Sequence, residues 1–257
     1  MAQFYENIKI NGIDLKSRFS IYSVNVNQSN ERVFGLDRSN ETEENNGKYL
    51  FVNNKGNLSN FPVELCKIDH NGNVLPISNI ELSELARILF KEGITTLEHK
   101  GVMYYGSFIN GKSWFNGGKQ GYLTLEFSMV SDKAYSRIMN DSIRVIEAKT
   151  IDVYNKSTAS SSVFVDLDVE LLSGTSFKIT NLKTGKTFEL SRLDEKERFY
   201  IYGQEREIVS KVDDGKNLFK LQSGDFKAME LVYGRNTLKI EGSCKVNIIR
   251  QDELCFI

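Results

Sequence analysis

Alternation of apolar and polar residues is the feature that most restricts the fold of this chain. Every second residue from Leu123 to Met129 is large and apolar, and the same alternation runs from Val163 to Leu171. A period of two places alternate side chains on opposite faces of a β-strand. Asn-Gly and other glycine-containing turns separate these segments, and the chain has only 2 prolines, as is typical of strands joined by hairpins. The pattern predicts a mainly β fold.

One segment has helical periodicity instead. Its apolar residues recur at the spacing of a single helix face, namely Leu82, Leu85, Ala86, Leu89 and Phe90. Ser78 with Glu81 three residues later has the pattern of a capping box, and Gly93 provides a stop. We predict a helix from about Asn79 to Glu92 that packs on a sheet, since no basic face accompanies the apolar one as it would in a membrane-surface helix.

The composition changes near Ile138 and indicates two domains. A polar stretch covers residues 155–162, and helical periodicity does not return after it. Short strands at regular spacing are predicted at Phe199–Tyr202, Asn217–Leu221, Met229–Tyr233, Leu238–Ile240 and Val246–Ile249. Such a series favours a β-sandwich over residues 139–257. Residues 1–138 are then a first, β-sandwich-like domain with one α-helix and extended hairpins.

Two hairpins are predicted to extend from the first domain. Met103–Ile109 and Tyr122–Met129 form one long hairpin, whose tip contains Trp114 and an Asn-Gly-Gly turn. Glu41–Lys48 is polar and acidic with an Asn-Asn-Gly sequence, which predicts an exposed loop or a second hairpin tip. These segments are candidate arms for contacts with a neighbouring subunit.

Charge and cysteine content exclude several classes of protein. The net charge of -1 leaves no excess of positive charge for phosphates, so neither specific nucleic-acid binding nor membrane binding is expected. No run approaches the length of a membrane span, and no secretory leader is predicted. Cys66, Cys244 and Cys255 are widely spaced and odd in number, so neither a disulfide framework nor a zinc site is expected.

Candidate catalytic residues are few, and each has a simpler structural explanation. Alternation places Asp166, Asp168 and Glu170 on one strand face, which suits a glycosidase or a calcium site but equally a solvated outer face. Asp213-Asp214-Gly215 is interpreted as a turn. His70 and His99 are predicted to lie in surface loops and have no accompanying nucleophile motif. We therefore predict no catalytic, cofactor-binding or metal-binding residue and no enzymatic activity.

Tyrosines of the second domain leave one alternative open. Tyr200, Tyr202 and Tyr233 could stack on a sugar ring, as in a carbohydrate-binding module used for host-surface attachment. Tyrosines on sandwich strands also serve in packing.

Several segments together resemble the distal tail protein (Dit) family of long-tailed phages. Ile8–Asp14, Ile80–Phe90, Tyr104-Tyr105-Gly106 and Gly121–Ser128 are similar to the first domain of that family. Gly224-Asp225-Phe226 and Leu231-x-x-Gly234-x-Asn236-x-Leu238-x-Ile240 are similar to its galectin-like β-sandwich. The resemblance covers nearly the whole chain.

The resemblance implies a structural virion protein without catalysis or cofactors. Residues 1–138 would form a ring-shaped homo-oligomer, a hexamer, and residues 139–257 would be the galectin-like sandwich that projects outward. Such a hub joins the tail-tube protein to the tail-tip or tail-associated protein and to a receptor-binding protein. It would be assembled in the cytoplasm of the host bacterium and reside in the phage tail tip.

Overall fold

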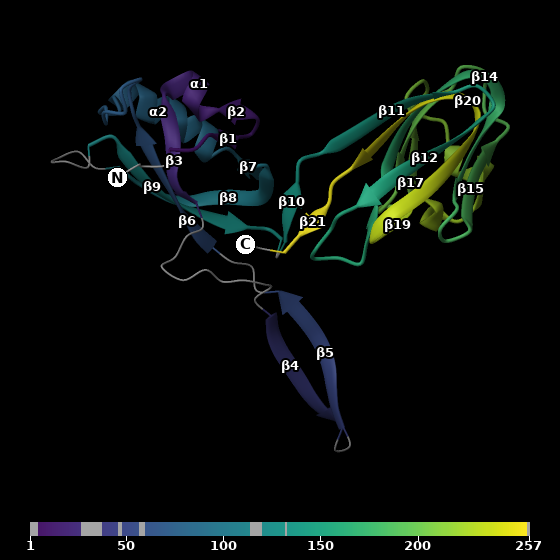
Figure 1. The fold of residues 1–257 in the computed structure, drawn as a ribbon, viewed down its shortest axis with the longest axis horizontal. Coiled ribbons are helices and arrows are strands. Elements are labelled where there is room, and N and C mark those ends of the chain that lie inside the picture. The colour runs from purple at the N-terminus through teal and green to yellow at the C-terminus, as the bar shows by residue number, and fades with distance from the viewer. Residues whose placement is uncertain are drawn as a thin grey trace. The chain divides into compact units, whose positions relative to one another are not determined.

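Antiparallel strands dominate the computed structural model, which describes residues 5–26, 38–45, 48–56, 60–113, 120–131 and 133–255 (Figure 1). The mainly β prediction is confirmed. The chain divides into two compact units, Met1–Tyr135 with Cys255–Ile257, and Ser136–Leu254. The longest helix among the described residues has 11 residues, too few to span a membrane.

The first unit contains a sheet with the strand order β2-β1-β7-β8-β9-β6-β3. Its elements are β1 (Ile8–Ile10), β2 (Ile13–Asp14), α1 (Leu15–Phe19), β3 (Ile21–Val26), β6 (Asn60–Lys67), α2 (Asn79–Leu89), β7 (Thr95–His99), β8 (Val102–Ser113), β9 (Tyr122–Met129) and β10 (Ala134–Ser136). An isolated bridge pairs Glu6, just before β1, with Ser23 in β3, the strand at the far end of the order. A single sheet therefore curls on itself and encloses its own apolar face. The sequence had predicted a β-sandwich-like domain instead.

Both predicted hairpins are confirmed. β8 and β9 pair from Gly106↔Met129 to Ser113↔Leu123, and the tip with Trp114 lies outside the described residues. β4 (Arg38–Asn45) and β5 (Lys48–Gly56) form a separate two-stranded sheet that ends at the pair Asn45↔Lys48. The predicted tip segment Glu41–Lys48 is therefore mostly strand, and its turn and the exposure of its side chains lie outside what the structure describes.

Helix α2 begins as predicted but ends earlier and presents a different face. Ser78 and Glu81 form the capping box, with the Ser78 amide donating to Glu81 Oε2 at 2.8 Å. The last helical residue is Leu89, not Glu92, because Phe90 already has φ −103° and ψ 36°. The residues buried on the helix are Leu85, Ile88 and Leu89. The predicted members Ala86 and Phe90 are exposed, so the core-facing stripe is rotated toward Ile88.

The second unit contains most of the remaining strands. These are β11 (Met139–Val145), β12 (Ala148–Asn155), β13 (Ser162–Phe164), β14 (Asp166–Asn181), β15 (Lys186–Ser191), β16 (Arg198–Tyr202), β17 (Glu207–Ser210), β18 (Gln222–Gly224), β19 (Glu230–Val232), β20 (Gly234–Arg250) and β21 (Glu253–Leu254). Two predictions are wrong here. Leu238–Ile240 and Val246–Ile249 belong to one strand, β20, and Leu218–Leu221 is a 3₁₀ helix capped by Asn217.

The sandwich is built on β14 and β20, which pair along nearly their whole length. Register shifts between Leu171 and Lys178 mark a corner in β14, and Gly242 occupies the corner of β20 with a φ of +122°. On one side of the corner the order is β11-β20-β14-β16-β17, and on the other it is β12-β20-β14-β15-β18. Two long bent strands therefore contribute to both layers.

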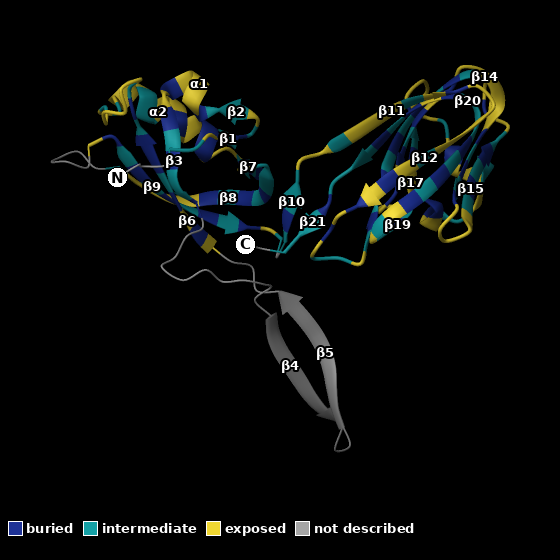
Figure 2. Cartoon of the chain, viewed as in Figure 1, coloured by how far each residue is buried: buried dark blue, intermediate teal, exposed yellow. Residues whose placement is uncertain are grey.

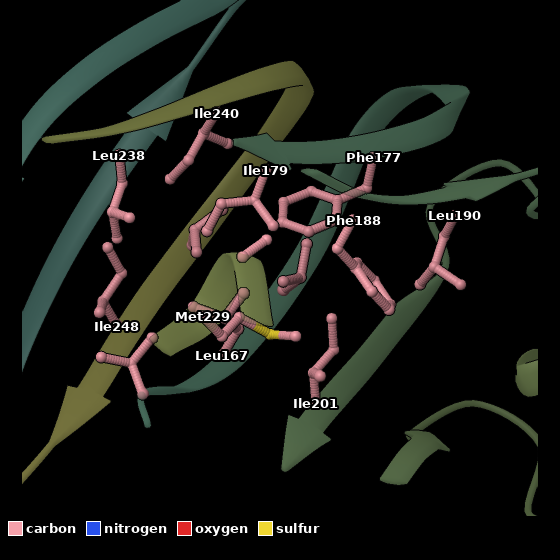
Figure 3. Close-up of a cluster of buried hydrophobic side chains, with 14 of the residues drawn as sticks. Leu167, Phe177, Ile179, Phe188, Leu190, Ile201, Met229, Leu238, Ile240 and Ile248 are labelled. Carbon is pink, nitrogen blue, oxygen red and sulfur yellow. The ribbon is translucent and has the colours of Figure 1, made fainter. Parts of the chain in front are cut away.

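Apolar side chains from both layers meet in one core. Figure 3 shows its centre, where Leu167, Ile201 and Ile248 of the first layer lie with Ile179, Phe188 and Ile240 of the second. The predicted alternation from Val163 to Leu171 is confirmed, since every second residue is buried (Figure 2). The predicted segment consists of two strands, β13 and β14, which are separated at Val165. β13 pairs with β19, whereas β14 pairs with β16 and β20.

Candidate functional site

The acidic strand face contains Asp166, whose carboxylate fastens a neighbouring turn. Asp166 accepts a hydrogen bond from the Tyr200 hydroxyl at 3.2 Å and one from the Gly203 amide at 3.0 Å. Burial raises the pKa of Asp166, although these two hydrogen bonds oppose the shift. Burial and the adjacent carboxylate raise the pKa of Tyr200. Gly203 has no space for a side chain, since a Cβ would lie 2.3 Å from the Val165 carbonyl oxygen. Asp166 thus has a structural role, since it holds the turn at Gly203 against the start of β14.

The other two carboxylates of this face each meet a lysine. Asp168 lies 2.9 Å from Lys211 Nζ, which also sits 5.2 Å above the Tyr200 ring. Glu170 lies 3.5 Å from Lys245 Nζ. Within the described part of the chain, no three His, Cys, Asp or Glu side chains are grouped as a metal site requires. Lysines therefore balance the charge of two of the three carboxylates on this strand face.

Asp213-Asp214-Gly215 is a turn, as predicted, and it leads into an ion-pair cluster that the sequence did not indicate. The Gly215 amide donates to Asp213 Oδ1 at 2.9 Å. The next residue, Lys216, lies 2.6 Å from Asp194 and also bonds to Glu197, a carboxylate with only 2% of its side chain exposed. These contacts, the Asp194 hydrogen bond foremost, raise the pKa of Lys216. The cluster joins two loops far apart in sequence.

The two histidines lie in different environments. His70 is exposed, as predicted, but the surface prediction for His99 is wrong, since only 9% of that residue is exposed. His99 pairs with Ile8 across β1 and β7, which turns its side chain inward. Its Nε2 lies 2.8 Å from Glu6 Oε2, and burial lowers its pKa.

Two of the three tyrosines considered as a sugar platform are in contact with each other. Tyr200 and Tyr202 are neighbours on β16, with ring centroids 4.4 Å apart. Tyr200 lies opposite Asp168, near the start of β14. Tyr233 follows β19, and its carbonyl oxygen accepts a hydrogen bond from Lys183 at 2.8 Å.

Three buried asparagines hold β19 in place, a role that the sequence did not reveal. The Asn236 side chain donates to Val232 O at 2.6 Å and accepts from Val232 N at 3.0 Å. Asn181 donates to Glu230 O, and Asn155 donates to Leu231 O, each at 2.8 Å. Because β19 pairs through only three residues with β13, these amides supply partners for backbone groups that would otherwise be unsatisfied.

Two shallow depressions lie on the first unit. An apolar groove of about 130 Å³ is lined by Leu82, Ala86 and Phe90 of α2 and by residues of β8 and β9. A second depression of about 250 Å³ includes Asn60 and Glu126, which are hydrogen-bonded to each other at 3.1 Å. Neither brings together an acid, a base and a nucleophile.

No protein-family model and no curated protein matches this chain. Among solved structures, the chain is similar to the Dit protein of phage SPP1, described as a paradigm of the hub adsorption apparatus in phages that infect Gram-positive bacteria. The TM-score is 0.62 at 12% identity, over 96% of this chain and 99% of that chain.

The chain is also similar to a component of the phage P2 baseplate in its activated conformation with Ca, with a TM-score of 0.53, 13% identity, and coverage of 96% and 98%. For the same baseplate with Sr, the TM-score is 0.52 at 13% identity, over 95% of this chain and 98% of that chain. The TM-scores establish a shared fold, and identities this low establish no more than the fold. The coverage extends the likeness to both units.

Proposed function

We propose that this chain is a structural virion protein, the hub at the distal end of a phage tail. In this role it connects the tail tube to the tail tip or baseplate and to receptor-binding proteins. The observation that carries the proposal is the likeness of fold to the SPP1 Dit protein over 96% of this chain and 99% of that one. A match to one sandwich alone would fit many functions, whereas this match includes both units in order.

The same proposal assigns no catalytic role. The described carboxylates are occupied by lysines, a tyrosine and backbone amides, and no described cluster has the composition of a metal site. Asp166 and Asp213 instead accept hydrogen bonds from turn amides, and Asp168 and Glu170 pair with lysines.

A hub at the end of a symmetric tube must itself be symmetric. Identical subunits that repeat a head-to-tail contact close into a ring when the rotation permits. We assign ring formation to residues 1–138, with a hexamer as the expected size, and we assign the outward, galectin-like sandwich to residues 139–257. The β4–β5 hairpin is a candidate arm across the neighbouring subunit. The particle forms in the cytoplasm of the host bacterium and carries this protein at its tail tip.

Light scattering and electron microscopy of the full chain test this proposal. Multi-angle light scattering of the full chain should give six times the mass of one chain, with the mass of the tail-tube protein added when that partner is present, and class averages should show a closed ring. Immunogold labelling of the virion should mark the end of the tail. A protein that stays monomeric beside its tail partners and binds glycans through its second unit would replace the hub with a carbohydrate-binding module.

A further inference from the structure

Within the described residues, the two ends of the curled sheet of the first unit meet at the pair Glu6 and Ser23. Glu6 donates its amide to Ser23 O at 3.1 Å and accepts from the Ser23 amide at 2.9 Å. The Ser23 hydroxyl also donates to Glu6 O at 3.1 Å. The pair is an isolated bridge and not part of a longer ladder. We call Glu6, Ser23, His99 and Lys100 the closing seam.

The Glu6 carboxylate lies close to two residues of the seam, one at the end of β7 and one just after it. Glu6 Oε2 lies 2.8 Å from His99 Nε2, and Glu6 Oε1 lies 2.9 Å from Lys100 Nζ. The side chain of His99 is 10% exposed, that of Glu6 is 32% exposed, and that of Lys100 is 55% exposed. The histidine is thus enclosed, while the lysine reaches water. Such enclosure is unfavourable for a charged imidazolium.

We propose that the closing seam is an acid-sensitive latch, which is shut while Glu6 is charged and His99 is neutral and which opens as the pH falls. Opening separates Glu6 from Ser23 of β3 and exposes the backbone groups of that pair to water. The rest of the sheet keeps its ladders, since these do not depend on the bridge.

The two titrating groups act in the same direction. Burial holds the pKa of His99 below its ordinary value of 6.5, and Lys100 adds to this effect while Glu6 partly offsets it. Burial alone would raise the pKa of Glu6, but Lys100 and His99 outweigh it and hold that pKa below 4.5. The open seam therefore binds protons more readily in both cases. Opening is favoured as the pH falls below 6.5 and further as it approaches 4.5.

Charged side chains next to the seam on β1 and β7 pair with each other. Lys9 and Glu98 occupy the alternate positions of β1 and β7 and pair with each other at 3.5 Å. β3, with sequence IYSVNV, contributes no acidic or basic side chain. The chain has only 2 histidines, and the other one, His70, is exposed. His70 therefore provides a matched control.

Hydrogen exchange of the full-length protein tests the latch. Exchange at Glu6 and Ser23, corrected for the intrinsic effect of pH, should become about tenfold faster between pH 7.5 and 5.5 relative to amides of β8 and β9. His99→Gln, which stays neutral, should abolish this pH dependence, and His70→Gln should retain it. Equal behaviour of wild type and His99→Gln, or an equal acceleration throughout β8 and β9, would overturn the proposal.

A titration of the unmodified protein makes the test independent of whether the variants fold. Nuclear magnetic resonance of ¹³C-labelled histidine should show that the pKa of His99 is below its ordinary value of 6.5, with the Ser23 amide resonance shifting together with His99. If the pKa of His99 is at or above about 6.5, or if Ser23 does not respond, the seam is not an acid latch.

Discussion

Replacement of Asn236 by alanine should destabilise the sandwich more than any other single loss of an amide. Asn236 has no exposed surface and makes three hydrogen bonds, two to Val232 and one to Gly234 O at 3.1 Å. Asn236→Ala removes all three and leaves the amide and carbonyl of the half-buried Val232 without these partners.

The size of the effect follows from those contacts. A hydrogen bond contributes about 1 kcal/mol net, and each buried group left unsatisfied costs about 1 to 3 kcal/mol. Asn236→Ala should therefore lower the free energy of unfolding of the second unit by about 3 to 5 kcal/mol. Asn236→Asp keeps the shape but places a charged acceptor against two carbonyl oxygens, so its cost at pH 7 should be at least as large.

Hydrogen exchange is suited to this measurement because it reports on each unit separately. Each tenfold acceleration of exchange in β14 and β20 corresponds to about 1.4 kcal/mol. Asn247→Ala is the control, since Asn247 lies on the same strand at a half-buried outward position. It should cost less than about 0.5 kcal/mol. A loss below about 1 kcal/mol for Asn236→Ala would refute the role assigned to the buried asparagines.

Three further predictions concern other parts of the chain. Leu85→Ala should cost about 2 to 5 kcal/mol in chemical unfolding, whereas Ala86→Ser on the exposed side of α2 should cost less than about 0.5 kcal/mol; equal effects would contradict the rotated face. Changing Asp166 and Asp168 together to Asn should leave phage infectivity intact, and its loss with normal assembly would show a role beyond folding. Gly106→Ala should prevent normal pairing of β8 with β9, because the new Cβ would lie 2.1 Å from Ser128 O; an unchanged melting temperature would show that the backbone can move.

Local sequence patterns determined the features that depend on neighbouring residues. The alternation from Val163 to Leu171 specified the buried face of that segment, because successive side chains of a strand point to opposite sides. Ser78 and Glu81 specified where α2 begins, because a capping box satisfies backbone groups within the same turn. Prediction of these features needed no knowledge of distant parts of the chain.

The tertiary structure decided the features that depend on distant residues. Ile88 rather than Phe90 is buried because the sheet beneath α2 sets the rotation of the helix. Burial of His99 follows from its pairing with Ile8, 91 positions earlier in the sequence, and not from the glycine turn beside it. Likewise, periodicity cannot specify that the Asn236 side chain forms hydrogen bonds with the backbone of β19. Its hydrogen bonds exist only after the corner in β14 and β20 has brought two layers together around a short strand that lacks a full set of partners.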